Sequence, residues 1–167
     1  MNKTRILYLL LAMAAAVWLG SRFFGDEESK VRRQLEAIRE LIAKSPGEGA
    51  LDGVGRAASF AELFAEPFEA AVASAGQQIG DKGQLMQAFA GFRHASERIT
   101  LDYRAVEILV AANEREATAT FEALLNGGPG GLLAGEAFPV ELRFRKVDGE
   151  WLVARARVGE PIRRGGS

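Results

Sequence analysis

The sequence predicts an α+β domain in which three helices pack on a strongly curved antiparallel sheet. Two periodicities lead to this prediction. Between Val31 and Phe92 apolar residues recur with the spacing of amphipathic helices, and from Ile99 onward they alternate with polar residues as in half-buried strands. A change of phase between Ala105 and Val106 then indicates a β-bulge that bends the first long strand. Helices that precede a bent sheet are typical of an α+β fold.

Composition limits both the size of the domain and its chemistry. A chain of 167 residues, 48% hydrophobic and 26% charged, suits one globular domain with a short appendage and excludes a disordered or multi-span membrane protein. The lack of cysteine excludes disulfides, thiolate metal sites and a cysteine nucleophile. His94 is the single histidine, so a multi-histidine metal centre is excluded, and we predict no metal and no other cofactor. The net charge of -1 argues against nucleic acid as a partner.

Residues 1–25 are predicted to form a signal-anchor or transmembrane segment. Lys3 and Arg5 precede residues 6–20, which carry no charge. At about 1.5 Å per residue this run covers roughly 22 Å of the ~30 Å hydrocarbon core, and Arg22 with the two phenylalanines that follow can extend it to the headgroups. We therefore expect the chain to meet a membrane through this segment.

A cleaved signal peptide is the alternative interpretation of the same segment. The small residues suited to cleavage lie inside the apolar run, and a cut after Gly20 would place bulky Trp18 three residues before it. The basic residues before the run favour a cytoplasmic amino terminus, although the arginines and lysine after it weaken that signal. We expect a single-pass inner-membrane protein with its domain on the periplasmic side. Cleavage would instead leave the domain soluble in the periplasm.

The domain is predicted to span residues 26–160, and its first helix begins at the acidic residues 26–28. Val31, Leu35, Ile38 and Ile42 form one apolar stripe, and residues 44–47 end the helix.

A glycine-rich link is then expected to lead to a shorter second helix. Ser59 and Glu62 have the spacing of a capping box, which predicts a helix start there and an end at residues 66–67. Residues 68–74 are a weak candidate for a short strand. Asp81 is predicted to cap the third helix with Gln84 three places on, and this helix turns Leu85, Met86, Phe89 and Phe92 inward.

Two hairpins make up the rest of the domain. In the first hairpin, two strands are joined by a tight turn at residues 113–114. Its apolar residues are expected to pair across the strands, Val106 with Phe121, Ile108 with Ala119 and Val110 with Ala117. Residues 127–131 are predicted to form one flexible loop, and residues 161–167 are predicted to form a disordered basic tail.

The closing hairpin allows two registers. A two-residue turn at residues 148–149 would pair Phe144 with Val153 and place two arginines among apolar side chains. A three-residue loop over 147–149 pairs Phe144 with Leu152 and keeps every apolar residue of both strands on one face. We therefore expect the second register, in which Trp151 lies opposite Arg145 on the outer face.

This arrangement resembles the nuclear transport factor 2-like fold, in which a curved sheet wraps around its helices as a cone. Residues 79–85 (IGDKGQL) look like that family's entry to the third helix, and residues 146–153 (KVDGEWLV) resemble its closing hairpin. The resemblance covers about residues 30–158, and with the anchor predicted from residues 1–25 the chain is expected to be a membrane-anchored bacterial member of the superfamily. Because the superfamily holds isomerases, dehydratases, polyketide cyclases, transport factors and secretion-system subunits, the resemblance implies no single activity.

Enzymes that resemble this fold work inside the cone with an Asp or His base, and often with a Tyr or acid that polarises a carbonyl, so an enzyme here would be expected to place such groups inside the cone. The predicted concave face is instead wholly apolar, and none of its residues can transfer a proton. They are Val106, Ile108, Val110, Ala117, Ala119, Phe121, Phe138, Val140, Leu142, Phe144, Leu152, Ala154, Ala156 and Val158. His94, Tyr103 and Glu69 are weak catalytic candidates at the sheet edge or on the helices. A helix-end histidine and a packed tyrosine are the simpler interpretations of the first two.

The outer face of the sheet is the predicted interaction face, because tryptophan with arginine is an interface composition. Its residues are Leu109, Arg143, Arg145, Trp151, Val153, Arg155 and Arg157. A solvated, ion-paired surface is the competing interpretation.

Three functions follow in order of preference. The first is a membrane-tethered, non-enzymatic envelope domain that binds a partner protein or its own copy through the outer face. The second is a module that binds an apolar small molecule in the cone. The third is an isomerase, dehydratase or cyclase, for which the apolar interior is the main objection.

Overall fold

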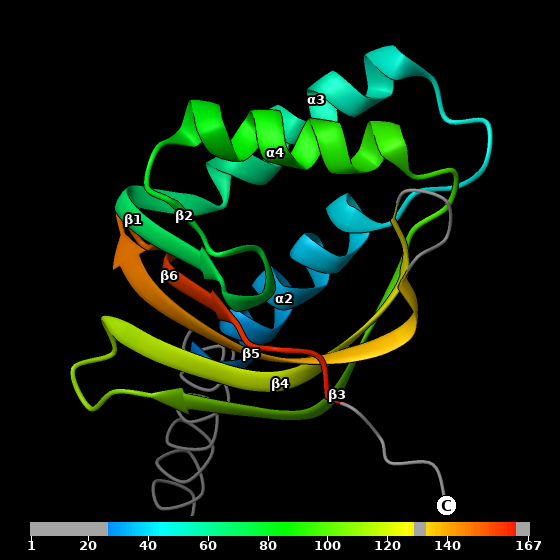
Figure 1. Ribbon diagram of the computed structural model, residues 1–167. Coiled ribbons are helices and arrows are strands. Elements are labelled where there is room, and N and C mark those ends of the chain that lie inside the picture. Colours follow the sequence, from blue (N-terminus) through cyan, green and yellow to red (C-terminus); the bar gives the residue numbers. More distant parts are fainter. Residues whose placement is uncertain (1–26, 129–132, 163–167) are drawn as a thin grey trace, which may run out of the picture.

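Six strands form one curved sheet that wraps around three helices in the computed structural model (Figure 1). The structure describes residues 27–128 and 133–162. In chain order the elements are α2 (Glu27–Ile42), α3 (Ala50–Glu62), β1 (Phe64–Val72), η1 (Ala73–Ala75), β2 (Gln77–Ile79), α4 (Lys82–Ala95), β3 (Thr100–Val110), β4 (Glu116–Gly127), β5 (Leu133–Val147) and β6 (Glu150–Val158).

The sheet is mixed, and the antiparallel sheet predicted from the sequence is therefore corrected. Its order is β2-β1-β6-β5-β4-β3, and β1 pairs with β6 in parallel while the other neighbours are antiparallel. Sequence alternation gives the faces of a strand but not its neighbour, so the weak strand signal at 68–74 contained no information about this pairing. The short strand β2 was not predicted.

The predicted anchor, residues 1–25, lies outside the described residues and stays a prediction. Within the described ranges, no helix is long and apolar enough to cross a membrane. At the other end, the Ile162 amide still donates to the Ala137 carbonyl oxygen at 2.7 Å, so the chain remains attached to the sheet inside the predicted tail. Residues 163–167 of that tail lie outside the described ranges.

Helices α2 and α4 match their predictions. Val31, Leu35 and Ile38 of α2 are buried, and the Asp81 side chain caps α4 by accepting from the Gln84 amide at 2.9 Å.

The predicted start of the second helix is wrong. Ser59 lies in the last turn of α3, whose N-cap is Gly49, so the helix begins nine residues before the expected capping box. Its glycines at 53 and 55 lie within the helix, because the alanines around them favour helix enough to offset their cost. The chain then enters β1 at Phe64, where the helix was expected to continue.

The predicted bulge in β3 is confirmed. Arg104 pairs with Glu122 and Glu107 with Thr120, so two residues of β3 lie opposite the single residue Phe121 of β4. Ala105 takes a φ of 50°, which turns the strand and keeps one apolar face across the bend. The pairs beyond the bulge also agree with the prediction.

The predicted register of the β5–β6 hairpin is wrong near its turn. Asp148 and Gly149 form a two-residue turn with φ values of 50° and 85°, and Phe144 pairs with Val153. A bulge at Ala154 then adds one residue to β6, so that Arg143 pairs with Arg155 and both arginine side chains stay on the outer face. The bulge supplies the extra residue that the sequence argument had assigned to the loop.

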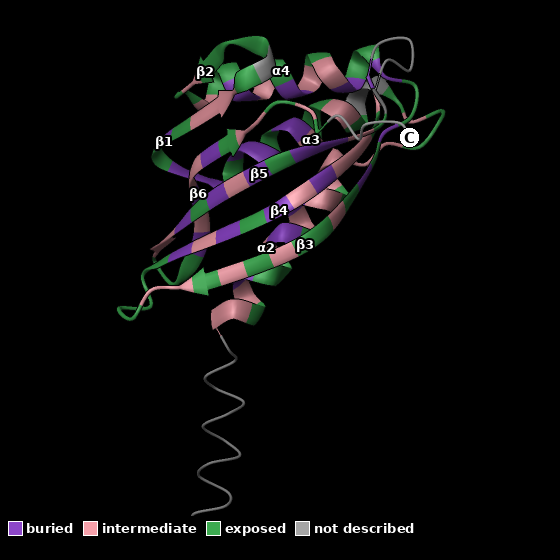
Figure 2. Ribbon diagram, turned by 60° about the horizontal axis from the view of Figure 1, so that its bottom comes forward, coloured by how far each residue is buried: buried purple, intermediate pink, exposed green. Residues whose placement is uncertain are grey.

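Burial follows from these registers. Buried and less buried residues alternate along β4 and β5 (Figure 2), and Phe144, Leu35, Val31 and Val153 are among the largest side chains that are completely buried. The core therefore lies between the concave face and the helices.

Candidate functional site

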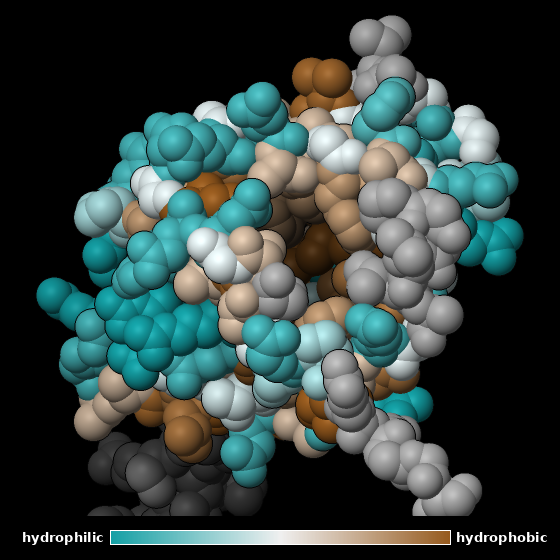
Figure 3. Space-filling view, viewed as in Figure 1, coloured by the Kyte–Doolittle hydropathy of each residue, from teal (hydrophilic) through white to brown (hydrophobic). Residues whose placement is uncertain are grey.

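A cavity of about 250 Å³ lies between the helices and the concave face of the sheet. It opens on the side of the molecule seen in Figure 3, where the hollow has a hydrophobic floor. The lining residues are Ile38, Ile42, Phe60, Phe64, Phe89, Phe92, Leu101, Tyr103, Phe121, Ala123, Leu125, Phe138, Val140, Leu142, Val153, Ala156 and Val158. Every segment of the fold except η1 and β2 contributes to this wall.

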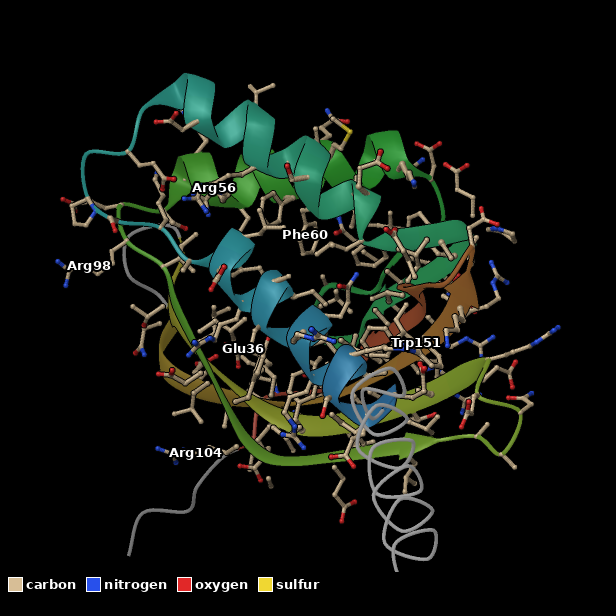
Figure 4. All side chains as sticks on the ribbon, turned by 180° about the vertical axis from the view of Figure 1, so that it is seen from behind. Glu36, Arg56, Phe60, Arg98, Arg104 and Trp151 are labelled. Carbon is tan, nitrogen blue, oxygen red and sulfur yellow. The ribbon has the colours of Figure 1, made fainter. Side chains whose placement is uncertain are left out.

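Two bulges contribute to the curvature of the sheet around the hollow. The bulge at Ala105 bends β3, and the bulge at Ala154 bends β6 where it passes the hollow. Small side chains at Ala123 and Ala156 leave the space unfilled. The helices close the roof, and Phe60 points inward from α3 (Figure 4).

Aromatic rings form much of the wall and contact one another. The rings of Phe60 and Phe89 are stacked, with centroids 4.2 Å apart and planes 12° apart. Phe60 also meets Phe64 at 5.3 Å, and Tyr103 meets Phe121 at 4.6 Å. Such contacts hold the rings in fixed orientations around the hollow.

Tyr103 is the single described lining residue with a polar side-chain atom, and that atom already has a partner. Its hydroxyl donates to the Leu35 carbonyl oxygen at 3.1 Å. Burial raises the pKa of the Tyr103 hydroxyl above its usual value, and the charge of Glu36 raises it further. The group is therefore a neutral phenol whose proton is held by the backbone of α2.

The three weak catalytic candidates are not brought together. His94 is exposed on the last turn of α4, where it borders a surface cleft with Lys44 and Glu48. Glu69 is on the outer side of the sheet and pairs with Arg155 at 3.0 Å. Of the three, only Tyr103 lines the cavity. No three carboxylate or imidazole groups of the described residues gather closely enough to hold a metal ion.

The outward orientation predicted for Trp151 and Val153 is wrong. Both are buried, at 4% and 0% exposure, because the two-residue turn places them on the same face as Phe144. Leu152 and Ala154, which were expected on the concave face, are only half-buried; Leu152 pairs with outward-facing Arg145, and Ala154 lies at the bulge.

The remaining residues of the predicted interaction face do lie on the outer surface. Leu109 is 72% exposed. Arg143 pairs with Glu141 at 3.0 Å, and Arg145 donates to two carbonyl oxygens of β1 at 3.3 Å each. Arg157 is exposed opposite Glu141.

Sequence reasoning missed a buried arginine at the end of the helices. Arg93 is 2% exposed, and its guanidinium donates to the carbonyl oxygens of residues 41–43 at the end of α2 and to Glu48 at 2.7 Å. Desolvation lowers the pKa of Arg93 from its usual value, and Glu48 opposes that change. Its position four residues after Phe89, on the buried stripe of α4, was the available signal.

A second missed contact joins the first turn of α2 to the closing hairpin. The Glu27 carboxylate accepts from Trp151 Nε1 at 2.7 Å and pairs with Lys30 and Lys146 at 2.7 and 2.9 Å. The two lysines hold the pKa of Glu27 at about 2. Trp151 lies beside the start of α2 (Figure 4), where its indole nitrogen reaches the Glu27 carboxylate.

No protein-family profile matches the chain, and no curated protein does. Solved structures do match it. An NTF2-like protein with a cystatin-like fold from Novosphingobium aromaticivorans is 15% identical, covers 89% of this chain and 90% of its own, and superposes with a TM-score of 0.63. A candidate dehydratase of the NTF2-like family from Streptomyces avermitilis is 16% identical over 81% of this chain and 95% of its own, with a TM-score of 0.64.

The chain has the NTF2-like fold. A candidate scytalone dehydratase from Novosphingobium aromaticivorans is also similar, at 14% identity over 80% of this chain and 83% of its own, with a TM-score of 0.62. At such identities the likeness concerns the fold, and the NTF2-like cone hosts many chemistries. The function must therefore be argued from the cavity of this particular cone.

Proposed function

We propose that this NTF2-like domain binds an apolar small molecule in its cavity and does no proton-transfer chemistry on it. The observation that carries the proposal is a hollow of about 250 Å³ whose described lining is carbon apart from one tyrosine hydroxyl. An apolar, concave and preformed pocket is the usual form of a small-molecule site.

The affinity that such a pocket can supply is modest. A ligand of about ten non-hydrogen atoms, each contributing about 0.5–0.8 kcal/mol, binds with a Kd between about 1 µM and 0.2 mM. That range suits a carrier or sensor that exchanges its ligand.

An isomerase or dehydratase function has less support. Such chemistry needs a base beside the substrate and a donor that polarises its carbonyl. The Tyr103 hydroxyl already donates its hydrogen bond to the Leu35 carbonyl oxygen, while His94 and Glu69 do not line the cavity.

Calorimetric titration of naphthalene into the full chain, carried in lipid nanodiscs, tests the proposal. We expect saturable binding that the cavity-filling variant Ala123→Phe abolishes and that Ala112→Phe, at an exposed turn position, leaves intact. Partition of naphthalene into lipid is the same for the unchanged chain and the two variants, so it cancels when their heats are compared. Equal heats in all three samples would reject the proposal. If Ala123→Phe fails to fold by circular dichroism, Ala123→Leu replaces it.

We also propose that residues 1–25 tether the domain to a membrane with the cone on the periplasmic side. The support is the charge-free run of residues 6–20 between basic residues. Because the chain has no cysteine, a single Ala112→Cys reports the location of the domain. We expect the chain to resist carbonate extraction and this thiol to react in intact spheroplasts with an impermeant maleimide. Extraction into the soluble fraction would reject the tether.

A contact through the outer face is the second candidate function, favoured by exposed Leu109. In the sheet Leu109 lies beside Thr118, Thr118 beside Arg143 and Arg143 beside Arg155, which makes one row across four strands. If this row joins two copies, sedimentation of the full chain will show a dimer that Leu109→Arg converts to a monomer. A monomer at high concentration would count against it.

A further inference from the structure

We propose that the part of the ligand inside the cavity is a rigid bicyclic hydrocarbon of about ten carbons without a carbonyl group. This inference rests on the proposed binding function and specifies the chemical class of the ligand. Three properties of the cavity carry it: the polarity, volume and shape of its lining.

The polarity of the described lining disfavours a buried carbonyl group. Tyr103 Oη is 3.1 Å from the Leu35 carbonyl oxygen, and the other described lining side chains contain only carbon and hydrogen. A carbonyl group of the ligand would lose its water on entry and find no free donor among these side chains, because the Tyr103 hydroxyl already donates to Leu35. The resulting penalty corresponds to about 5- to 150-fold in affinity. Any carbonyl group of the ligand therefore lies outside the mouth, whereas a ligand hydroxyl could donate only to the Tyr103 oxygen.

The volume sets the number of carbon atoms. An engineered apolar cavity of about 150 Å³ stays dry and binds benzene, which has six carbons. In the same proportion, about 250 Å³ accommodates about ten carbons. A single ring would leave a void in this cavity, whereas three fused rings would have to protrude from it.

The shape of the wall favours a flat, rigid molecule over a flexible chain. The stacked pair Phe60 and Phe89 forms one side, and Phe121 and Phe138 of the sheet form another. Fixed aromatic rings make offset or edge-to-face contacts with a planar ring system. A linear chain of the same carbon number would also lose the freedom of its rotatable bonds on binding.

Three ligands with about ten carbons test the inference on the full chain in nanodiscs. Naphthalene, 1-tetralone and n-decane are titrated, and heats from the Ala123→Phe variant are subtracted. We expect naphthalene to bind at least 5-fold more tightly than the ketone 1-tetralone and more tightly than n-decane.

The outcomes separate this inference from the function on which it rests. Tighter or equal binding of 1-tetralone would overturn the polarity argument, and tighter binding of n-decane would overturn the shape argument, while either result would support a small-molecule function of the cavity. Failure of all three to bind above the Ala123→Phe baseline would reject the function itself.

Discussion

Trp151 Nε1 donates a hydrogen bond to Glu27 Oε2 at 2.7 Å across the interface between α2 and the closing hairpin. Lys146 pairs with the same oxygen and lies 5.4 Å from the centre of the Trp151 ring. The first turn of α2 is thus attached to the sheet, which fixes the helix that supplies Ile38 and Ile42 to the cavity.

The ionisation of Glu27 makes the stability of the domain depend on pH. Its pKa of about 2 in the folded state lies below the ordinary 4.5, so its contribution to stability is complete above pH 4.5 and is lost as the pH falls toward 2. Because the carboxylate is partly screened by solvent, we expect that contribution to be about 1–2 kcal/mol. Urea unfolding at pH 7 and pH 3 measures it. In Glu27→Gln, the difference in the free energy of unfolding between pH 7 and pH 3 should be smaller by that amount. An unchanged difference would contradict the assignment of this pH dependence to Glu27.

Arg93 should contribute more to the free energy of unfolding than any charged side chain at the surface. Arg93→Met removes the donor for the carbonyl oxygens of residues 41–43 at the end of α2 and one of the two arginines that pair with Glu48, and we expect a loss of about 3 kcal/mol in unfolding free energy. Arg98, which projects into solvent (Figure 4), is the matched control. Arg98→Met should change stability by less than about 0.5 kcal/mol. Equal losses in the two variants would refute a special role for Arg93.

Two glycines should respond in opposite directions to alanine. Gly149 has a φ of 85° in the hairpin turn, so Gly149→Ala should destabilise by about 1 kcal/mol or more. Gly53 lies within α3 with nothing within 4 Å of an added Cβ, so Gly53→Ala should stabilise by about 0.5–1 kcal/mol. Thermal unfolding of the two variants checks both signs. Stabilisation by Gly149→Ala would mean that the hairpin register described above is wrong.

Removal of the candidate general bases should not affect ligand binding. His94→Ala and Glu69→Gln change side chains that do not line the cavity, and we expect naphthalene to bind each variant within twofold of the unchanged chain. Calorimetry provides the comparison. A loss of tenfold or more in either variant would place the ligand elsewhere.

The sequence predicted those features that depend on the order of apolar and polar residues along one strand or helix. The phase change at Ala105 was enough to locate the bulge in β3, and the cap at Asp81 was enough to start α4. The hairpin at Asp148 shows the limit of this reasoning. A longer loop and a bulge at Ala154 correct the phase equally well, and the tertiary contacts that distinguish them, such as the hydrogen bond from Trp151 to Glu27, are not visible in the local pattern.

The site was predictable in its chemistry but not in its shape. The apolar character of the concave face could be derived from Phe121, Phe138, Val140 and Leu142 alone. Whether those side chains fill the cone depends on the distance between the helices and the sheet, which two bulges and the alanines at 123 and 156 determine together. No local pattern reports a distance of that kind.

Intermolecular nuclear Overhauser effects test the central claim most directly. With methyl-labelled isoleucine, leucine and valine in the full chain, naphthalene protons should show contacts to Ile42, Val140 and Leu142 inside the cavity. Contacts confined to Leu109 or Val54, whose side chains are exposed, would contradict the proposed site.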